Sequence, residues 1–266
     1  MTLPDLPHTL RAWRDGAVGR IEFANPAKRN AISLAMWRGL EQAVAAFETD
    51  PAIRLLILSG SGEKAFSAGA DISEFDQVRA DPPAVAAYET AVVAAEKRLK
   101  TCAKPTLAMI RGYCVGGGLS VALECDLRYA DTTAVFAIPA ARLGLAYGAK
   151  GLTDLLAVVG PAAAKEILFT GRHFSAAEAA AMGLVNRVVE PDALATSVAD
   201  VAAAITANAP LTIAAAKRTV NELLAPESER DMAACRRLMD KCFASADYTE
   251  GRRAFAEKRS PRFTGR

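Results

Sequence analysis

Hydrophobic and polar positions in the first sixty residues change between strand-like and helix-like spacing. Residues 17–24 (AVGRIEFA) predict a strand that ends at a turn signal. Behind Ser33, apolar residues recur every three or four positions, which predicts an amphipathic helix with this serine as its N-cap. Residues 53–59 form a short, almost wholly apolar run, whose length favours a buried strand. The expected order is therefore strand, helix, strand.

The middle of the chain continues with short buried segments separated by turns. The pattern predicts a helix over 85–99, a strand over 106–110, a short buried helix over 119–125, strands over 127–130 and 135–138, and a helix from Pro161 to about Phe169. Ser175 and Glu178 form a capping box for a further helix, with Gly183 suited to its end. A strand follows over 185–189.

From about Pro191 the texture changes, because strand signals stop and Ala-rich, then Arg/Lys-rich, helical patterns take over. We predict an α/β core over residues 1–200 and a helical C-terminal region over residues 201–266, with a soft boundary near residue 200.

Composition narrows the possible functions. The 266 residues are 52% hydrophobic and 23% charged with a net charge of +2, which fits a globular protein without a basic stripe for nucleic acid. No apolar run is long enough to span a membrane, and no signal segment opens the chain, so we expect a cytoplasmic protein. The five cysteines are scattered without a CxxC pair, and the two histidines lie in no metal spacing, so we expect neither disulfides nor a metal site.

Two loops carry the most specific chemistry. One is Phe66–Ile72 (FSAGADI) and the other is the triplet Gly116–Gly118, which precedes the short buried helix. Backbone N–H groups fixed in turns stabilise a developing oxyanion, and a helix start adds its positive dipole end. Ala68 and Gly117 are therefore candidate donors of an oxyanion hole, although each loop taken singly is better explained as an ordinary close-packed turn.

Longer motifs resemble the crotonase (enoyl-CoA hydratase/isomerase) superfamily in order and spacing over roughly residues 12–264. They are 25–31 (NPAKRNA), 66–72 (FSAGADI), 111–119 (RGYCVGGGL), 165–171 (KEILFTG), 179–186 (AAAMGLVN) and 250–259 (EGRRAFAEKR). The resemblance implies an α/β fold, a crotonase-like spiral of ββα turns with a helical C-terminal region. It also implies an acyl-CoA thioester as substrate, with no other cofactor, and assembly as a homotrimer or a dimer of trimers through the C-terminal region.

The resemblance implies roles for particular residues. Ala68 and Gly117 match the two donors to the thioester carbonyl. Residues that match the coenzyme A contacts of the family are Lys28 and Arg29 near the phosphates, Ala70, Asp71 and Ile72 beside adenine and pantetheine, and Phe255 and Lys258 in a tail that sometimes serves a neighbouring subunit. For the charged residues in this set, a solvated surface role is the alternative.

Two positions depart from the hydratases of the family. Hydration of an enoyl thioester uses carboxylates to activate water and to deliver a proton. The first hydratase glutamate aligns with Ser120 and the second with Ala140, both expected in the substrate pocket. Neither a serine at its ordinary pKa nor an alanine performs that proton transfer.

Other groups are possible replacements. Tyr147 lies near the place where decarboxylases resembling methylmalonyl-CoA decarboxylase carry a tyrosine, and its phenol is suited to holding a substrate carboxylate, or else it is a packed aromatic. Glu124 shares a helix face with Ser120 and either acts there or pairs with a cation. Lys150 and Asp154 are expected at the surface.

The sequence thus predicts an acyl-CoA-binding enzyme of this family that stabilises a thioester enolate without the hydratase glutamates. Three alternatives stay open: an acyl-CoA decarboxylase or lyase using Tyr147, a hydratase or isomerase using unusual groups, and a non-catalytic acyl-CoA-binding protein. We expect residues 73–100 to form part of the pocket wall.

Overall fold

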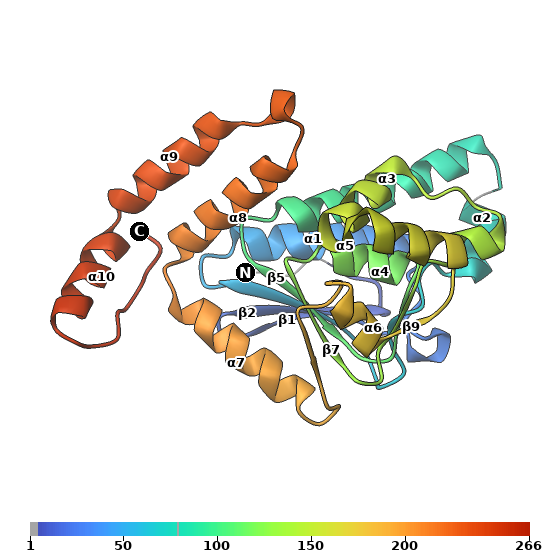
Figure 1. The fold of residues 1–266 in the computed structure, drawn as a ribbon, viewed down its shortest axis with the longest axis horizontal. Helices are drawn as coiled ribbons and strands as arrows, with labels where there is room; N and C mark the ends of the chain where they lie inside the picture. Colours follow the sequence, from blue (N-terminus) through green and yellow to red (C-terminus); the bar gives the residue numbers. More distant parts are fainter. Residues whose placement is uncertain (1–4, 79) are drawn as a thin grey trace.

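The computed structural model describes residues 5–78 and 80–266, so residue 79 of the expected pocket wall lies outside the described residues. Within these residues the strands form two sheets (Figure 1). The larger sheet has the order β1 (Leu10–Asp15), β2 (Val18–Phe23), β3 (Leu55–Gly60), β5 (Thr106–Ile110), β7 (Leu127–Asp131) and β10 (Arg187–Val189). The smaller sheet has the order β4 (Ala65–Ser67), β6 (Tyr113–Val115), β8 (Val135–Ala137) and β9 (Phe174–Ser175).

Helices fill most of the remaining chain. They are α1 (Leu34–Thr49), α2 (Phe75–Val78), α3 (Pro82–Thr101), α4 (Gly117–Glu124), α5 (Ala149–Thr170), α6 (Ala176–Ala181), α7 (Leu194–Ala207), α8 (Pro210–Leu224), α9 (Met232–Phe243) and α10 (Ala246–Ala256). Local sequence signals account for several ends. The Ser33 Oγ accepts a hydrogen bond from the Met36 N–H, and the capping box of Ser175 and Glu178 is formed, as predicted.

The chain repeats one path. Each turn adds a strand to the larger sheet, a strand to the smaller sheet and then a helix, in the order β3–β4–α3, β5–β6–α4 and β7–β8–α5. The β3, β5 and β7 strands run parallel, and so do β4, β6 and β8. The expected spiral of ββα turns with a helical C-terminal region is therefore confirmed.

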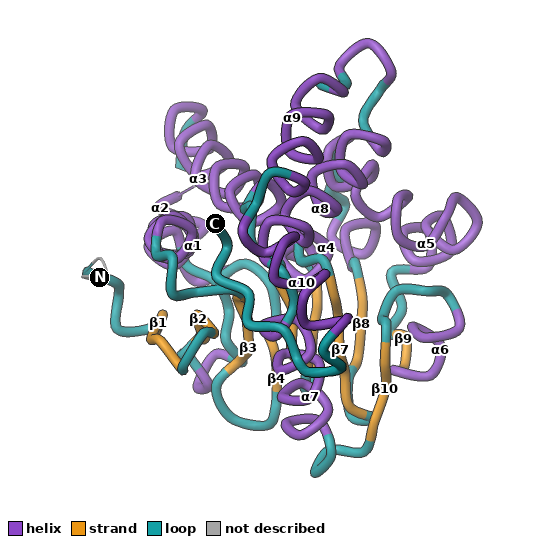
Figure 2. The backbone as a smooth tube through the Cα atoms, turned by 90° about the vertical axis from the view of Figure 1, so that its left-hand side faces the viewer, coloured by secondary structure: helices purple, strands orange, loops and turns teal. Residues whose placement is uncertain are grey.

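The larger sheet is covered on both faces, which explains its nearly continuous apolar strands. Leu56 and Leu58 of β3 belong to the main core with α1, α3 and α4, whereas Leu55 and Ile57 pack with α7 in a second core. Figure 2 shows α7 apart from the layer formed by α1 and α3, with the strands between them. Alternate residues of one strand thus fix helices on opposite sides.

Parallel pairing of β4 with β6 brings the two loops of interest together. Ser67 pairs with Cys114, so the chain leaves both strands at the same edge of the smaller sheet. These strands of three residues each are too short to show a periodicity, and the sequence therefore pointed to the longer β3 and β5 as the preceding strands.

Two predicted boundaries differ from the structure. Residue 200 lies inside α7, whose Leu194, Val198 and Ala202 pack under the sheet. The change from strand-like to helical sequence pattern therefore comes before the end of the α/β core. The helix predicted from Pro161 continues a helix that starts at Ala149, with a kink at Gly160 (φ +74°). The sequence pattern did not predict the first half of α5, because the helix face that packs on the core is partly polar there.

The C-terminal helices α9 and α10 project from the body (Figure 1), and α8 ties them to it. Lys217 of α8 donates to Asp126 Oδ2 at 2.8 Å and to the Lys104 carbonyl at 3.0 Å. Across the described ranges, no single helix is long and apolar enough to cross a membrane. Only α7 and α8 taken together reach those limits, and they are bent by 105° at their junction.

Candidate active site

Two backbone nitrogens, those of Ala70 and Gly117, lie close together between the loops. A Cβ built on Gly117 would lie 3.5 Å from the Ala70 nitrogen, and one built on Gly69 would lie 3.2 Å from the Gly117 nitrogen. Neither the Ala70 N–H nor the Gly117 N–H donates to another group in the described part of the chain. Both residues are half-buried. The pair therefore offers two neighbouring donors to a ligand oxygen.

The structure corrects the prediction for Ala68. Its N–H donates to the Arg29 carbonyl at 2.9 Å and is thus used inside the fold. The donor on this loop is two residues later, at Ala70, because the bridge between Ile32 and Ala70 turns the chain. The sequence pattern does not reveal which N–H of this loop is free, since that depends on contacts with residues 29–32.

Glycines make this approach possible. Gly69 has φ +98°, a conformation that L side chains rarely adopt, and a Cβ there would lie 2.9 Å from the Val115 carbonyl oxygen. A Cβ on Gly118 would lie 2.5 Å from the Ser67 carbonyl oxygen. The Gly117 N–H is at the first position of α4, where helix N–H groups lack intrahelical partners and the dipole is positive.

A carboxylate from another helix lies at the Ser120 side chain. Ser120 is half-buried and follows Gly117 by three residues on α4, so the two share a helix face. Its hydroxyl donates to Oε1 of Glu96, a residue of α3 that is 7% exposed. The position that resembles the first hydratase glutamate thus has no carboxyl of its own but contacts one.

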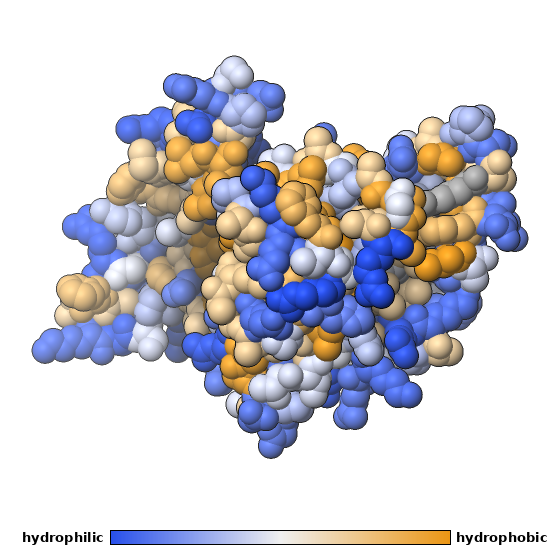
Figure 3. Space-filling model, turned by 45° about the vertical axis from the view of Figure 1, so that its right-hand side comes forward, coloured by the Kyte–Doolittle hydropathy of each residue, from blue (hydrophilic) through white to orange (hydrophobic). Residues whose placement is uncertain are grey.

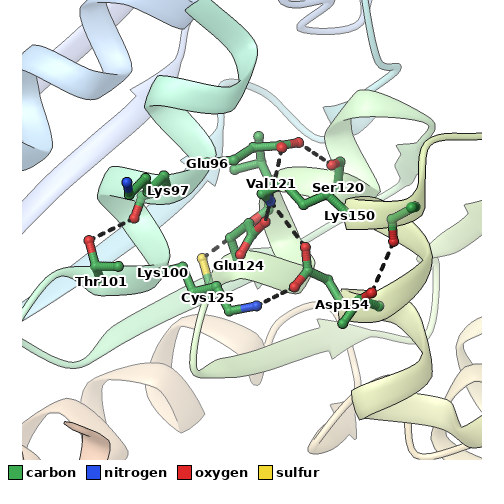
Figure 4. A network of polar contacts seen from close by, with 12 residues as sticks. Glu96, Lys97, Lys100, Thr101, Ser120, Val121, Glu124, Cys125, Lys150 and Asp154 are labelled. Carbon is green, nitrogen blue, oxygen red and sulfur yellow. Dashed lines mark hydrogen bonds and ion pairs between the residues drawn. The ribbon is translucent and has the colours of Figure 1, made fainter. Parts of the chain in front are cut away.

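Lys150 of α5 joins three acidic side chains (Figure 4). Its Nζ lies 3.1 Å from Glu96 Oε2, 3.1 Å from Asp154 Oδ2 and in contact with Glu124 Oε1. Lys100 of α3 also contacts Asp154. Because Asp154 is buried, the prediction that it lies at the surface is wrong, and Glu124 pairs with a cation, as one alternative proposed.

Protonation balances the charge of this cluster. Burial raises the pKa of Glu124 to about 8, and the neighbouring Asp154 adds to this effect, which the hydrogen bond from Lys150 only partly opposes. The Glu124 Oε2 atom is buried without a hydrogen-bond partner. Glu124 is therefore mostly neutral at pH 7, and the two lysines then face two carboxylates, Glu96 and Asp154.

Tyr147 lies beside Ser120. Burial and, next to it, the charge of Glu96 raise the pKa of Tyr147, and a side-chain hydrogen bond with Ser120 opposes them, so that the pKa is about 12. Its ring lies over α5, where a Cβ on Gly151 would lie 2.6 Å from the ring. The phenol is thus neutral at physiological pH and able to donate a hydrogen bond.

Ala140 is the other predicted pocket residue without a proton-transferring group. It lies in a 3-10 turn over Pro139–Leu143, is half-buried and packs against the main core. Its carbonyl accepts from the Leu145 N–H at 3.0 Å. Leu143 and Leu145 beside it are exposed, so the wall on this side is apolar.

The predicted coenzyme A residues divide into separate groups. Lys28 donates to Asp71 Oδ2 at 2.8 Å and to Ser73 Oγ at 2.6 Å, beside the loop of Ala70. Partial burial opposes ionisation of Asp71, but the hydrogen bonds from Lys28 and Ser73 outweigh it and lower its pKa. Ile72 is 67% exposed next to this ion pair. Arg29 turns away, and its guanidinium lies 4.9 Å from the Tyr113 ring centroid.

Phe255 and Lys258 are not brought to this loop within one chain. Phe255 is 87% exposed near the end of α10, and Lys258 follows it. In Figure 1, α10 lies at one end of the molecule and α2, which follows Ile72, at the other. A shared site with these residues therefore requires a neighbouring copy of the chain.

Sequence reasoning missed Glu96. A signal for it exists, because Glu96 falls among the buried positions Tyr88, Ala91, Ala95 and Leu99 of α3. A charged residue on an apolar helix face is unusual unless it is paired. No group of three or more His, Cys, Asp or Glu side chains suited to a metal ion occurs among residues 5–78 and 80–266.

The chain resembles known proteins over most of its length. A sequence model of the family described as "Enoyl-CoA hydratase/isomerase" matches residues 14–266. The short-chain-enoyl-CoA hydratase of Clostridium acetobutylicum is 31% identical over 248 residues, which cover 92% of this chain and 94% of that protein. The crotonyl-CoA hydratase of Syntrophomonas wolfei is 35% identical over 240 residues, covering 90% and 91%.

A solved structure agrees over nearly the whole chain. The enoyl-CoA hydratase/carnithine racemase of Magnetospirillum magneticum has a TM-score of 0.91 at 40% identity, covering 98% of this chain and 97% of that one. The fold and the length of the chain are therefore shared with that protein. This chain belongs to the enoyl-CoA hydratase/isomerase family of the crotonase superfamily.

Proposed function

We propose that the protein is an acyl-CoA enzyme that stabilises the enolate of a thioester. The thioester oxygen accepts hydrogen bonds from the Ala70 and Gly117 N–H groups, and both bonds strengthen as negative charge develops on that oxygen. The observation that carries the proposal is the pair of neighbouring N–H groups without partners in the described chain, one of them at a helix N-terminus.

Membership of the family supports coenzyme A as the group to which the acyl chain is attached. Lys28 stands half-exposed at the rim of the Ala70 loop, where it is suited to a phosphate, and Ile72 offers an apolar contact to adenine. Asp71 keeps its role as the partner that orients Lys28. We assign Arg29 no contact with the nucleotide because it stacks on Tyr113.

We further propose that several copies assemble through the C-terminal arm, α8–α10. Figure 3 shows hydrophobic atoms along the side of this arm that faces the body. Besides Phe255, the large apolar residues exposed on these helices are Val220, Leu223, Leu224, Met232, Met239, Phe243 and Tyr248. Burial of such a surface favours association. In a homotrimer or a dimer of trimers, a neighbour then supplies Phe255 and Lys258 to the nucleotide.

Double-bond migration or hydration fits the site better than decarboxylation. Tyr147 would suit a substrate carboxylate as a hydrogen-bond donor, which keeps decarboxylation as the second candidate. However, the Glu96 carboxylate contacts the Ser120 hydroxyl, and its negative charge disfavours a second carboxylate nearby.

The test is the variant Gly117→Pro, which removes one donor at the first helix position, where proline is tolerated. Glu227→Pro makes the same change at the first position of the 3-10 turn Glu227–Glu229, away from the site. We expect Gly117→Pro to lower kcat/KM for a short enoyl- or acyl-CoA by about 100-fold or more. Glu227→Pro should leave it unchanged. Equal activity of the two variants would contradict the proposed donor pair, and absence of thioester binding by the unmodified protein would contradict the function.

A further inference from the structure

We propose that Glu96 is the residue that transfers the proton at Cα of the thioester, in place of the glutamates absent at positions 120 and 140. This inference rests on the proposed enolate function and adds the group that forms the enolate. The proton carrier then comes from α3, not from α4 or from the 3-10 turn that holds Ala140.

Position is the first argument. Ser120 shares the α4 face with Gly117, and its hydroxyl contacts Glu96. The Glu96 carboxylate is therefore one side-chain hydrogen bond away from the face that carries the oxyanion donor. Tyr147 lies at the same place, since it bonds to Ser120 and senses the charge of Glu96.

Orientation is the second argument. The Glu96 Oε1 atom accepts from Ser120, and its Oε2 lies 3.1 Å from Lys150 Nζ. Two partners on different helices thus fix the rotamer of a side chain that is 7% exposed. Each carboxylate oxygen has two lone pairs, so both keep capacity to accept a proton from a substrate. A fixed carboxylate beside a bound thioester is the arrangement that proton abstraction needs.

Charge is the third argument. Lys100 and Lys150 face Glu96, Asp154 and Glu124, of which Glu124 holds a proton near neutral pH. The positive charge of Lys150 thus lies 3.1 Å from the carboxylate that we propose as the base. A cluster built only to hold α3, α4 and α5 together would not need a carboxylate at its Ser120 end.

The step is balanced without a cofactor. The Glu96 carboxylate removes the proton from Cα, the C–H electron pair becomes the enolate C=C bond, and the carbonyl π electrons move to the oxygen held by Ala70 and Gly117. The carboxylic acid then returns the same proton to Cα, or to Cγ of a 3-enoyl thioester, where the double bond moves into conjugation. Hydrogen exchange at Cα needs only removal of the proton by Glu96 and return of a proton to the same carbon.

The experiment follows exchange of the Cα hydrogens of butyryl-CoA in deuterated water by mass spectrometry. This saturated thioester can be neither hydrated, isomerised nor decarboxylated, so only proton transfer is observed. Glu96→Gln keeps shape and polar contacts but removes the base. Glu89→Gln is the matched control, because Glu89 is exposed on the same helix. Titration calorimetry measures binding of butyryl-CoA, and thermal unfolding measures folding.

We expect Glu96→Gln to lose exchange at least 100-fold with the Kd for butyryl-CoA within about threefold, while Glu89→Gln exchanges normally. Should Glu96→Gln fail to fold, Glu96→Asp keeps the charge for Lys150 but withdraws the carboxylate by one methylene, and we expect at least a tenfold loss. Normal exchange by either folded variant overturns the assignment of Glu96. Binding without exchange by the unmodified protein overturns it too, yet leaves thioester binding intact. Absence of binding overturns the proposed function itself.

Discussion

The Ser120 hydroxyl on α4 donates a hydrogen bond to the Glu96 carboxylate on α3, joining residues 24 positions apart in the sequence. The same carboxylate is linked onward to Lys150 of α5, whose Nζ lies 3.1 Å from Glu96 Oε2. The residue at position 120 has no carboxyl group, but the carboxyl group of Glu96 lies in contact with it. Several consequences can be measured.

Restoring a glutamate at position 120 should not restore a hydratase site. Ser120→Glu places a second carboxylate against Glu96, and two such groups in one half-buried site repel each other. We expect the free energy of unfolding to fall by about 1–3 kcal/mol. In the double variant Ser120→Glu/Glu96→Gln, the amide donates to the new carboxylate and most of that loss should be recovered.

Chemical denaturation of the two single variants and the double variant measures this coupling. The expected interaction between the two sites is about 1–2 kcal/mol and favourable. Strictly additive effects would mean that Ser120 and Glu96 do not interact in solution.

The position of Tyr147 depends on the missing side chain of Gly151. In Gly151→Ala, the new Cβ meets the Tyr147 ring at 2.6 Å, so the ring must leave its place beside Ser120. Stability should change by less than about 1 kcal/mol, because alanine favours the helix and the ring end can move. The Tyr147 pKa should drop from about 12 towards its ordinary value of 10.0 as the ring becomes solvated.

Spectrophotometric tyrosine titration, compared with that of Tyr147→Phe, isolates this group. Gly148→Ala is the control, because a Cβ there meets nothing within 4 Å. An unchanged titration curve in Gly151→Ala would mean that the ring does not lie over α5.

Glu124 should make the protein less stable as pH rises. Its pKa is about 8 in the folded chain against an ordinary 4.5, so between these values the folded state holds a proton that the unfolded state has lost. The stabilisation is complete below about pH 4.5 and is lost as pH rises through 8. The slope is up to about 1.4 kcal/mol per pH unit. The charged groups of the cluster around Glu124 are those of Lys150 and Asp154 on α5 and of Lys100 and Glu96 on α3, and they stay in place as the pH changes.

Glu124→Gln removes this titration and keeps the side-chain shape. Urea denaturation at several pH values from 5 to 8.5 should give a shallower decline for the variant than for the unmodified protein. Parallel curves would show that Glu124 ionises at an ordinary pKa.

The Ala70 loop depends on the backbone of Gly69. An alanine there must adopt φ +98° and places its Cβ 2.9 Å from the Val115 carbonyl and 3.2 Å from the Gly117 nitrogen. We expect a loss of about 2–4 kcal/mol in the free energy of unfolding. Turnover should fall as well, because the added Cβ displaces the Ala70 N–H or the Gly117 N–H. Gly16→Ala is the control, since Gly16 has φ +60° but open space around it, and it should cost only about 1 kcal/mol.

Thermal unfolding and turnover of the two variants separate backbone strain from steric contact. If Gly69→Ala were no worse than Gly16→Ala, the close approach of the two loops would not exist in solution.

Local sequence was enough for much of the fold. The cap at Ser33, the apolar run of β3 and the capping box at Ser175 depend on residues within a few positions of each other, and all three formed as predicted. The same holds for the glycines at 116–118, which mark the start of α4. Periodicity, capping and glycine backbone freedom are properties of short segments, so a single sequence reports them.

Contacts between distant segments decided the rest. The parallel pairing of β4 with β6 set which loop ends meet, and the Arg29 carbonyl bound the Ala68 N–H and left Ala70 as the free donor. Glu96 reached Ser120 only because α3 packs on α4. The sequence alone determined the chain's segments, its family resemblance and the absence of carboxyls at 120 and 140. Tertiary structure decided which N–H is free and which carboxylate is near, because both depend on groups that only folding brings together.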